Sequence, residues 1–227
     1  MKHLKRLKQN RNNILHYRPE YMPTEGVVMP AMTEKGPLIL NYLDRAYQVF
    51  DHALKAHTKV LAVRFDLKIP RGITQPEDAK TNRVVRRFLA SLQSKINANL
   101  KRKHSPHKCP VRYIVAREIG GKNQNVHYHL MLLLNGHAFR HIGTMDYEGD
   151  NVFWLIVDAW ASALKVTSEE AVNGVQFGFR RGVVQYYLDP TEDYDKLPKA
   201  FHRASYLCKA HTKQYGERHH GLMTSKK

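Results

Sequence analysis

Four segments of the chain carry apolar residues at the spacing of an amphipathic helix. In the first of them, apolar residues recur at intervals of three and four positions, so that one stripe faces a core. Gly36-Pro37 precedes this segment, and Pro198 stands at a favourable first position for the last one. The predicted helices cover residues 36–57, 76–100, 151–166 and 198–215.

Short runs rich in β-branched and aliphatic residues lie between these helices. Residues 60–68 predict a buried strand that ends at Pro70. Residues 110–119 and 126–135 predict two further strands, and the turn-rich residues between them indicate a hairpin. One or two more strands are expected in residues 175–188.

The order of these elements predicts an α+β fold. The economical arrangement is a central antiparallel sheet with a β-α-β-β-α-β core, of the ferredoxin or RRM kind, flanked by helices. The length of 227 residues suits one large domain, which we expect to span residues 36–216. Residues 1–35 show no clear period and are interpreted as a basic arm or wrapped extension, and residues 217–227 as a basic tail.

The charge of the chain favours a polyanionic partner. Lys and Arg number 37 against 20 Asp and Glu, a net charge of +17, and residues 79–117 hold eleven basic and no acidic residues. Such a segregated field is typical of a protein that follows the phosphates of a nucleic acid, although a basic surface can also serve solubility alone. The candidate phosphate-binding residues are Arg83, Arg86, Arg87 and Lys213.

Composition excludes several other classes of protein. A content of 42% hydrophobic residues rules out wholesale disorder, and no apolar run approaches the roughly 18 residues of a membrane span. The first residues are basic but are followed by no apolar signal region. Two cysteines, Cys109 and Cys208, cannot form a disulfide framework or a four-cysteine zinc site. We therefore expect a reduced, cytoplasmic protein without a membrane partner.

A pair of histidines gives the first chemical signal. His127 and His129 lie two positions apart in a predicted strand, so both side chains point to one face while Tyr128 points to the other. Two imidazoles at this spacing can chelate one divalent ion. Paired histidines on a strand are as often an ordinary surface feature.

The predicted hairpin adds a carboxylate to this pair. If the turn centres on residues 122 and 123, Glu118 lies directly opposite His127 on the same face. Two imidazoles and one carboxylate suit Mg²⁺ or Mn²⁺. A shift of the register by one residue would turn Glu118 away, and Asp66 on the first strand is then the alternative ligand. The other interpretation of Glu118 is an ion pair with Arg117 or Lys122.

The last helix carries the second signal. Tyr206 and Lys209 are three positions apart and therefore lie on one face of a helix. A phenol is a weak nucleophile near neutral pH, but a neighbouring ammonium and a metal-held phosphate could activate it. A tyrosine on a helix more often packs in the core or at its rim.

Together these segments resemble the HUH endonucleases, in particular the rolling-circle replication initiators of filamentous phages (inoviruses) and related prophage proteins of the YagK/YfjJ type. Arg64-Phe-Asp-Leu-Lys-Ile-Pro70 is similar to their first-strand motif. His127-Tyr-His129 with the upstream Glu118 is similar to the His-hydrophobic-His motif, and Ser205-Tyr-Leu-Cys-Lys209 to the Tyr-x-x-Lys motif. The resemblance covers about residues 36–215, and no single motif is specific on its own.

The resemblance implies site-specific, metal-dependent nicking and rejoining of single-stranded DNA at a replication origin. Tyr206 would form a 5′-phosphotyrosine, Lys209 would stabilise charge, and His127, His129 and Glu118 would hold the metal. Position 210 is Ala, so the second tyrosine of some phage initiators is missing one turn later. No P-loop is visible, and unwinding and synthesis would fall to a host helicase and polymerase.

Two other functions remain open at this stage. A relaxase or a single-strand transposase would use the same chemistry on other targets. A non-catalytic module could instead bind single-stranded nucleic acid by stacking bases on Tyr113 or Tyr128.

Overall fold

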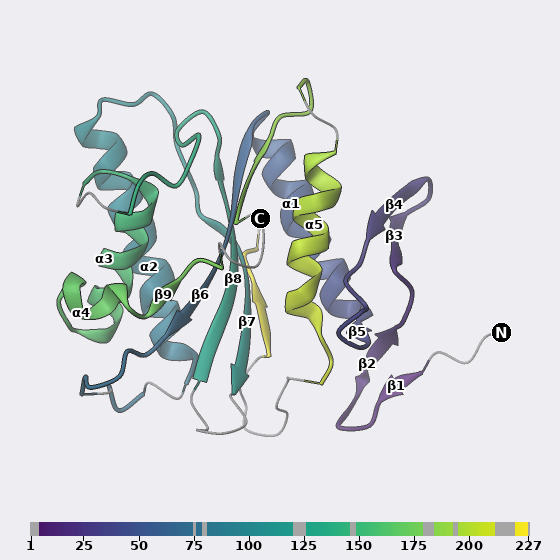
Figure 1. Cartoon of the computed structure of the whole chain (residues 1–227). Coiled ribbons are helices and arrows are strands. Elements are labelled where there is room, and N and C mark those ends of the chain that lie inside the picture. Colours follow the sequence, from purple (N-terminus) through teal and green to yellow (C-terminus); the bar gives the residue numbers. More distant parts are fainter. Residues whose placement is uncertain are drawn as a thin grey trace.

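The computed structural model describes residues 5–74, 76–78, 81–119, 126–145, 149–178, 184–192, 195–211 and 221–226. Its centre is an antiparallel sheet in which neighbouring strands follow the order β10-β6-β8-β7-β11, while β9 pairs with the far end of β6 (Figure 1). These strands are β6 (Val60–Lys68), β7 (Arg112–Ile119), β8 (Val126–Asn135), β9 (Val175–Gln176), β10 (Gln185–Leu188) and β11 (Leu222–Thr224).

Helices cover both faces of this sheet (Figure 1). On one face lie α2 (Asn82–Arg102), α3 (Val152–Leu164) and the short α4 (Ser168–Val172); on the other lie α1 (Leu40–Ala56) and α5 (Lys196–Ser205). Strand β8 shows why the sheet is buried on both sides. Leu130 and Leu132 pack with the α2–α3 layer, whereas the alternate residues Met131 and Leu133 pack with the α1–α5 layer. The predicted mixed fold with an antiparallel sheet is therefore confirmed.

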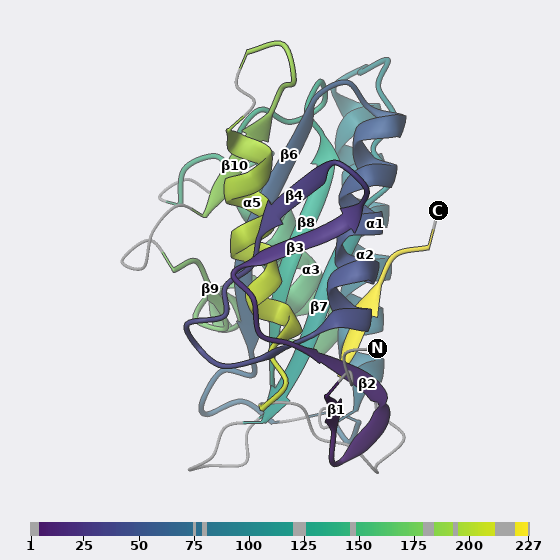
Figure 2. The same cartoon turned by 90° about the vertical axis from the view of Figure 1, so that its right-hand side faces the viewer.

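The first 35 residues contain regular structure that their sequence pattern does not predict. Strands β1 (Arg6–Leu7) and β2 (Asn10–His16) pair with each other, and β3 (Glu20–Thr24) pairs with β4 (Val27–Pro30). Figure 2 views the side on which β3 and β4 lie over α5 and α1. Tyr21 is buried there and stacks on Phe201 of α5, with 5.6 Å between ring centroids.

Two helix starts differ from the prediction. Leu38 and Ile39 form a short strand, β5, which pairs with β2, and α1 begins only at Leu40. The second helix begins at Asn82 rather than at Pro76, because the side chain of Thr81 accepts a hydrogen bond from the Arg83 amide and so caps it.

The last helix is shorter than predicted. Helix α5 runs from Lys196 to Ser205, and a 3₁₀ turn, η2 (Tyr206–Cys208), follows it. Lys209 then forms a bridge to Leu38, which ends the helical path. The predicted end of this helix at residues 215 and 216 lies outside the described residues.

Candidate functional site

One end of the sheet carries polar side chains on the face that α5 covers. Side chains alternate between the two faces along each strand, and at this end the ones on the α5 face are Asp66 of β6, His129 of β8 and Glu118 of β7. The register pairs Asp66 with His129 and Glu118 with His127. The predicted position of Glu118 opposite His127 is confirmed, and Asp66 lies on the same face.

His129 lies at the centre of this cluster. Its Nδ1 atom is 2.6 Å from Asp66 Oδ1, and its Nε2 atom is 3.1 Å from Glu118 Oε2. Arg64 forms an ion pair with Asp66, and its Nη2 atom lies 3.1 Å from His129 Nδ1. His129, Glu118 and Arg64 are buried, so the two carboxylates fix the imidazole in position while the guanidinium holds Asp66.

Tyr206 and Lys209 reach the cluster from the end of α5. The Lys209 ammonium lies 3.6 Å from Glu118 Oε1 and 3.7 Å from the centre of the Tyr206 ring. The Tyr206 ring meets the His129 ring edge to face, with 5.7 Å between centroids. Residues that are 77 or more positions apart in the sequence are therefore in direct contact.

The chain after α5 is held in place by the N-terminal segment. Ser205 Oγ accepts a hydrogen bond from the Met32 amide at 2.8 Å, and the Ala210 amide donates to the Pro37 carbonyl at 3.0 Å. These bonds, with the bridge between Leu38 and Lys209, fix both ends of the turn that carries Tyr206. Residues 32–38 thus help to position the candidate site.

Two titratable groups of the site are shifted by their surroundings. Burial by itself raises the pKa of Asp66, but the hydrogen bond from His129 and the charge of Arg64 outweigh it and hold that pKa well below its usual range. Burial, together with the charges of His129 and Lys68, lowers the pKa of His127. Asp66 is therefore ionised, and His127 is held in the neutral form that can act as a metal ligand.

The donor atoms fit a divalent metal ion in type. A neutral imidazole carries one proton, and the short contact to Asp66 favours its placement on Nδ1. The Nε2 lone pair of His129 then faces Glu118 Oε2 at 3.1 Å, and two acceptors so placed suit a cation held by both. Within the described ranges, no three His, Cys, Asp or Glu side chains already converge as a complete metal site. The rings of His127 and His129 are 6.2 Å apart.

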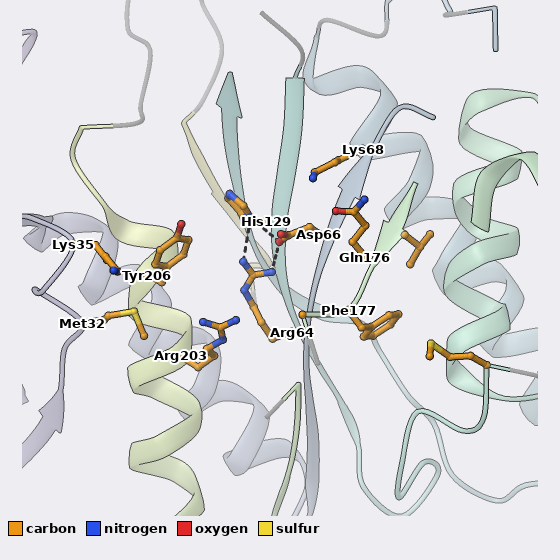
Figure 3. Close-up of a pocket in the computed structure, with 13 residues that line it drawn as sticks. Met32, Lys35, Arg64, Asp66, Lys68, His129, Gln176, Phe177, Arg203 and Tyr206 are labelled. Carbon is orange, nitrogen blue, oxygen red and sulfur yellow. Dashed lines mark hydrogen bonds and ion pairs between the residues drawn. The ribbon is translucent and has the colours of Figure 1, made fainter. Parts of the chain in front are cut away.

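A pocket of about 1000 Å³ opens beside Tyr206 and His129 (Figure 3). Four basic side chains line this pocket, and among the described residues Asp66 is the acidic side chain that lines it. The basic residues are Lys35, Arg64, Lys68 and Arg203. Sequence reasoning singled out none of these four as site residues. Two signals were available, because Arg64, Asp66 and Lys68 alternate along an otherwise apolar strand and Arg203 is one helical turn before Tyr206.

The candidate phosphate-binding residues of α2 lie apart from this pocket. Arg83 and Arg86 are exposed, and Arg86 lines a separate hollow of about 740 Å³ with Arg45 and Lys226. Arg87 instead forms an ion pair with Asp78 and donates to the carbonyl of Ala163 at the end of α3. Lys213 lies outside the described residues.

The aromatic residues named for base stacking differ in their exposure. Tyr128 is buried, and its hydroxyl donates to the Thr81 carbonyl at 2.7 Å, so its ring cannot receive a base. Tyr113 is partly buried against the core. Among the other tyrosines, Tyr187 donates to the Gly136 carbonyl and Tyr186 packs against the core.

Comparison with known proteins places the chain in a family. The profile of the YagK/YfjJ C-terminal domain family matches residues 25–224, so the chain belongs to this family. It is 28% identical over 193 residues to the uncharacterized protein YagK of Escherichia coli K12, covering 80% of this chain and 90% of YagK. It is 29% identical over 204 residues to the uncharacterized protein YfjJ of the same strain, covering 82% and 93%.

No solved structure matches the chain. Of the helices in the described part of the chain, none has both the length and the apolar character needed to cross a membrane.

Proposed function

We propose that this protein nicks and rejoins single-stranded DNA at a specific site through a covalent 5′-phosphotyrosine on Tyr206. The observation that carries the proposal is the convergence of Tyr206 and Lys209 on Glu118 and His129, at 3.6 Å between Lys209 and Glu118 and 5.7 Å between the two rings. A nucleophile, a buried cation and a possible metal-ligand set thus share one face of the sheet. This grouping is what phosphoryl transfer requires.

The chemical step exchanges one phosphodiester for another. The Tyr206 oxygen attacks the scissile phosphorus, the bond from phosphorus to the 3′ oxygen breaks, and the 5′ phosphate is joined to tyrosine. The phenol gives up its proton and the departing 3′ oxygen takes one up, so no water, oxidant or nucleotide cofactor is consumed. The reverse attack by a 3′-hydroxyl rejoins the strand, which makes nicking and strand transfer one reaction.

The residues around Tyr206 have separate tasks in this step. Lys209 supplies a positive charge over the Tyr206 ring in a buried position, where charge acts strongly. His127, His129 and Glu118 would hold a Mg²⁺ or Mn²⁺ ion, which when bound polarises the scissile phosphate. Asp66 is a positioning residue, because its hydrogen bond fixes the ring of His129.

The topology supports an HUH-type endonuclease domain. Along the chain, β6, α2, β7, β8, α3 and the strands β9 and β10 follow the order β-α-β-β-α-β. In the sheet, β6 and β8 are central and β7 lies beside β8. We assign this core to the ferredoxin-like arrangement of that superfamily.

We assign the reaction to the start of rolling-circle replication of a phage, satellite or plasmid. The free 3′-hydroxyl would prime synthesis by a host polymerase, with a host helicase unwinding the duplex. A relaxase or a single-strand transposase would leave the same covalent product. The three roles are distinguished by the DNA that is cut.

The experiment is a test for the covalent product. The full chain is incubated with a pool of fluorescent single-stranded oligonucleotides and Mn²⁺, and the mixture is separated on a denaturing gel. We expect a labelled protein band that survives SDS, and no such band after treatment with EDTA or in Tyr206→Phe.

Matched controls separate chemistry from binding. Tyr187→Phe removes a phenol that already donates to Gly136, and it should keep the band. Tyr206→Phe should retain DNA affinity, because most affinity comes from phosphate contacts elsewhere. If the wild type binds the oligonucleotides but no adduct forms with any of them, the protein is a binding module and the proposal is overturned.

A further inference from the structure

The pocket beside Tyr206 has more positive charge than the proposed reaction at one phosphate needs. Its volume of about 1000 Å³ is at the upper end for ligand pockets, which leaves room for more than a phosphate group. Lys35, Lys68 and Arg203 line it in addition to Arg64 (Figure 3). A site with this surplus favours a ligand that carries a further negative charge.

Arg203 is the basic residue for which a ligand role is best supported. It makes no hydrogen bond or ion pair with any residue that the structure describes, and its Nε atom is buried without a partner. Burial and the nearby charge of Arg64 lower the pKa of Arg203. Arg64, by contrast, already forms an ion pair with Asp66. An anion placed at Arg203 would therefore compensate a charge that the protein leaves unpaired.

The distance between Arg203 and Tyr206 along the helix indicates which kind of anion would bind at Arg203. The two residues are three positions apart at the end of α5, about one helical turn, and both line the same pocket. A single-stranded nucleic acid carries its phosphates in a row, one for each nucleotide. A phosphate at Arg203 would thus be the neighbour of the phosphate that Tyr206 attacks.

The pocket also offers an aromatic surface close to these cations. The ring of Phe177 lines the pocket next to Gln176 (Figure 3). It is held from behind by Phe65 and Phe153, with centroids 5.4 and 5.5 Å away. A fixed ring at the wall of a basic pocket is the usual platform on which a base stacks.

We infer that this pocket binds the nucleotide next to the scissile phosphate, with Arg203 on its phosphate and Phe177 against its base. The inference rests on the proposed function for the identity of the ligand as single-stranded DNA. It assigns to the pocket a binding step that needs neither the tyrosine nor a metal. The site can therefore be tested without any cleavage.

The experiment is isothermal titration of the full chain with two probes, thymidine 3′,5′-bisphosphate and inorganic pyrophosphate, at low salt and in EDTA. The first probe has phosphates and a base, and the second has phosphates alone. Arg203→Gln should weaken both probes by about tenfold or more, since a charge-assisted hydrogen bond is lost. Phe177→Leu should weaken the bisphosphate by about fivefold or more and leave pyrophosphate unchanged.

A matched control and a fold check accompany these variants. Lys199 also lies on α5, but its side chain is exposed and is not among the described residues that line the pocket, so Lys199→Gln should bind both probes like the wild type. Each variant is compared with the wild type by circular dichroism and thermal unfolding. Arg203→Lys keeps a positive charge without the guanidinium and should fall between the wild type and Arg203→Gln.

The outcomes separate this inference from the proposed function. It is overturned if the wild type binds neither probe at millimolar concentration, or if folded Arg203→Gln binds the bisphosphate as the wild type does. If the probes bind as expected but the wild type forms no covalent adduct with DNA, the nucleotide site stands and the proposed chemistry fails. If the adduct forms while Arg203→Gln binds normally, the chemistry stands and this subsite fails.

Discussion

Lys209 is buried to a degree that is rare for a lysine, with 4% of its surface exposed. Its ammonium lies between the Glu118 carboxylate and the Tyr206 ring. Glu118 is equally buried, so each charge depends on neighbouring polar groups for compensation. The contact links the end of α5 to β7, and we expect it to contribute to both stability and activity.

Removal of the Lys209 charge should therefore destabilise the fold. Lys209→Met leaves Glu118 short of a partner and should lower the free energy of unfolding by about 3–5 kcal/mol, measured by urea denaturation. The double variant Lys209→Met with Glu118→Gln should recover part of this loss, because the buried negative charge is then absent. The exposed Lys199→Met serves as the control and should change stability little. Equal stability of the wild type and Lys209→Met would contradict a coupled buried pair.

Single residues show how far the sequence predicts this site. Glu118 could be placed opposite His127 because a hairpin turn fixes the pairing of both strands. The partnership of Asp66 with His129 could not be derived, since it depends on which strand lies beside β8. Arg203 gave only a weak signal, because a basic residue on a helix is most often solvent-exposed.

At the scale of elements, tertiary contacts decide where the helices end. The apolar pattern continues past Ser205 through Leu207 and Ala210, which predicts a longer α5. In the fold, η2 tightens the chain and the Ala210 amide donates to Pro37 instead of to a helical carbonyl. A local sequence pattern cannot predict this contact with a distant segment, and the contact changes the surroundings of Tyr206.

The approach of β9 to β6 is another feature that no periodicity predicts. A Cβ atom at Gly174 would lie 2.3 Å from the Lys68 carbonyl oxygen and 2.9 Å from Trp160 Nε1. Glycine is needed there because the two backbones come so close. This packing sets the position of the adjoining Phe177 at the wall of the pocket.

An ion pair joins the start of β6 to the turn after β10. Lys59 Nζ lies 2.6 Å from Asp189 Oδ2, and hydrogen bonds from Lys59 and Thr191 lower the pKa of Asp189 to about 2. An unfolded aspartate has a pKa of about 3.9. Since the folded pKa is the lower one, this group stabilises the fold above about pH 4 and loses that effect as the pH falls toward 2.

Lys59→Met should therefore flatten the acid side of the stability profile. The difference in stability between wild type and variant should be largest above about pH 4 and should shrink between pH 4 and about pH 2, followed by thermal unfolding at each pH. Lys55→Met, which removes an exposed pair with Asp51, is the control and should leave the acid profile almost unchanged. A difference between wild type and Lys59→Met that does not vary with pH would refute this assignment.

At the scale of the whole molecule, basic residues lie on both sides of the sheet. The pocket of Tyr206 lies on the α5 side, whereas Arg83 and Arg86 project from α2 on the other. The charge pattern of the sequence predicts a phosphate-binding surface along α2. In the fold, that surface is separate from the candidate site. Arg87 forms an ion pair with Asp78 and a hydrogen bond with the end of α3.

Salt dependence of binding can separate these arginines. Arg83→Gln combined with Arg86→Gln should flatten the slope of log K against log salt by about 0.7 for each phosphate contact that is lost on single-stranded DNA. Arg87→Gln should leave the slope unchanged and lower the melting temperature, because its guanidinium is used within the fold. A flattened slope in Arg87→Gln, or an unchanged slope in the double variant, would overturn the α2 surface.

The mixed fold around an antiparallel sheet could be predicted because β6 and β8 are long and largely apolar, which is typical of central strands. The N-terminal strands could not be predicted from the sequence pattern. They are short, and they form against α1 and α5 rather than through a period of their own. Their stability comes from residues such as Tyr21, whose role appears only when Phe201 is in place.

The central claim is that Tyr206 becomes covalently joined to DNA. The most direct measurement digests the protein–DNA adduct with protease and nuclease and locates the remaining nucleotide by tandem mass spectrometry. The account predicts a 5′-phosphate on the Tyr206 oxygen in wild-type protein with Mn²⁺, and unmodified peptide in EDTA. A nucleotide on Tyr186, Tyr187 or Tyr215, or an adduct that forms equally well in Tyr206→Phe, would contradict it.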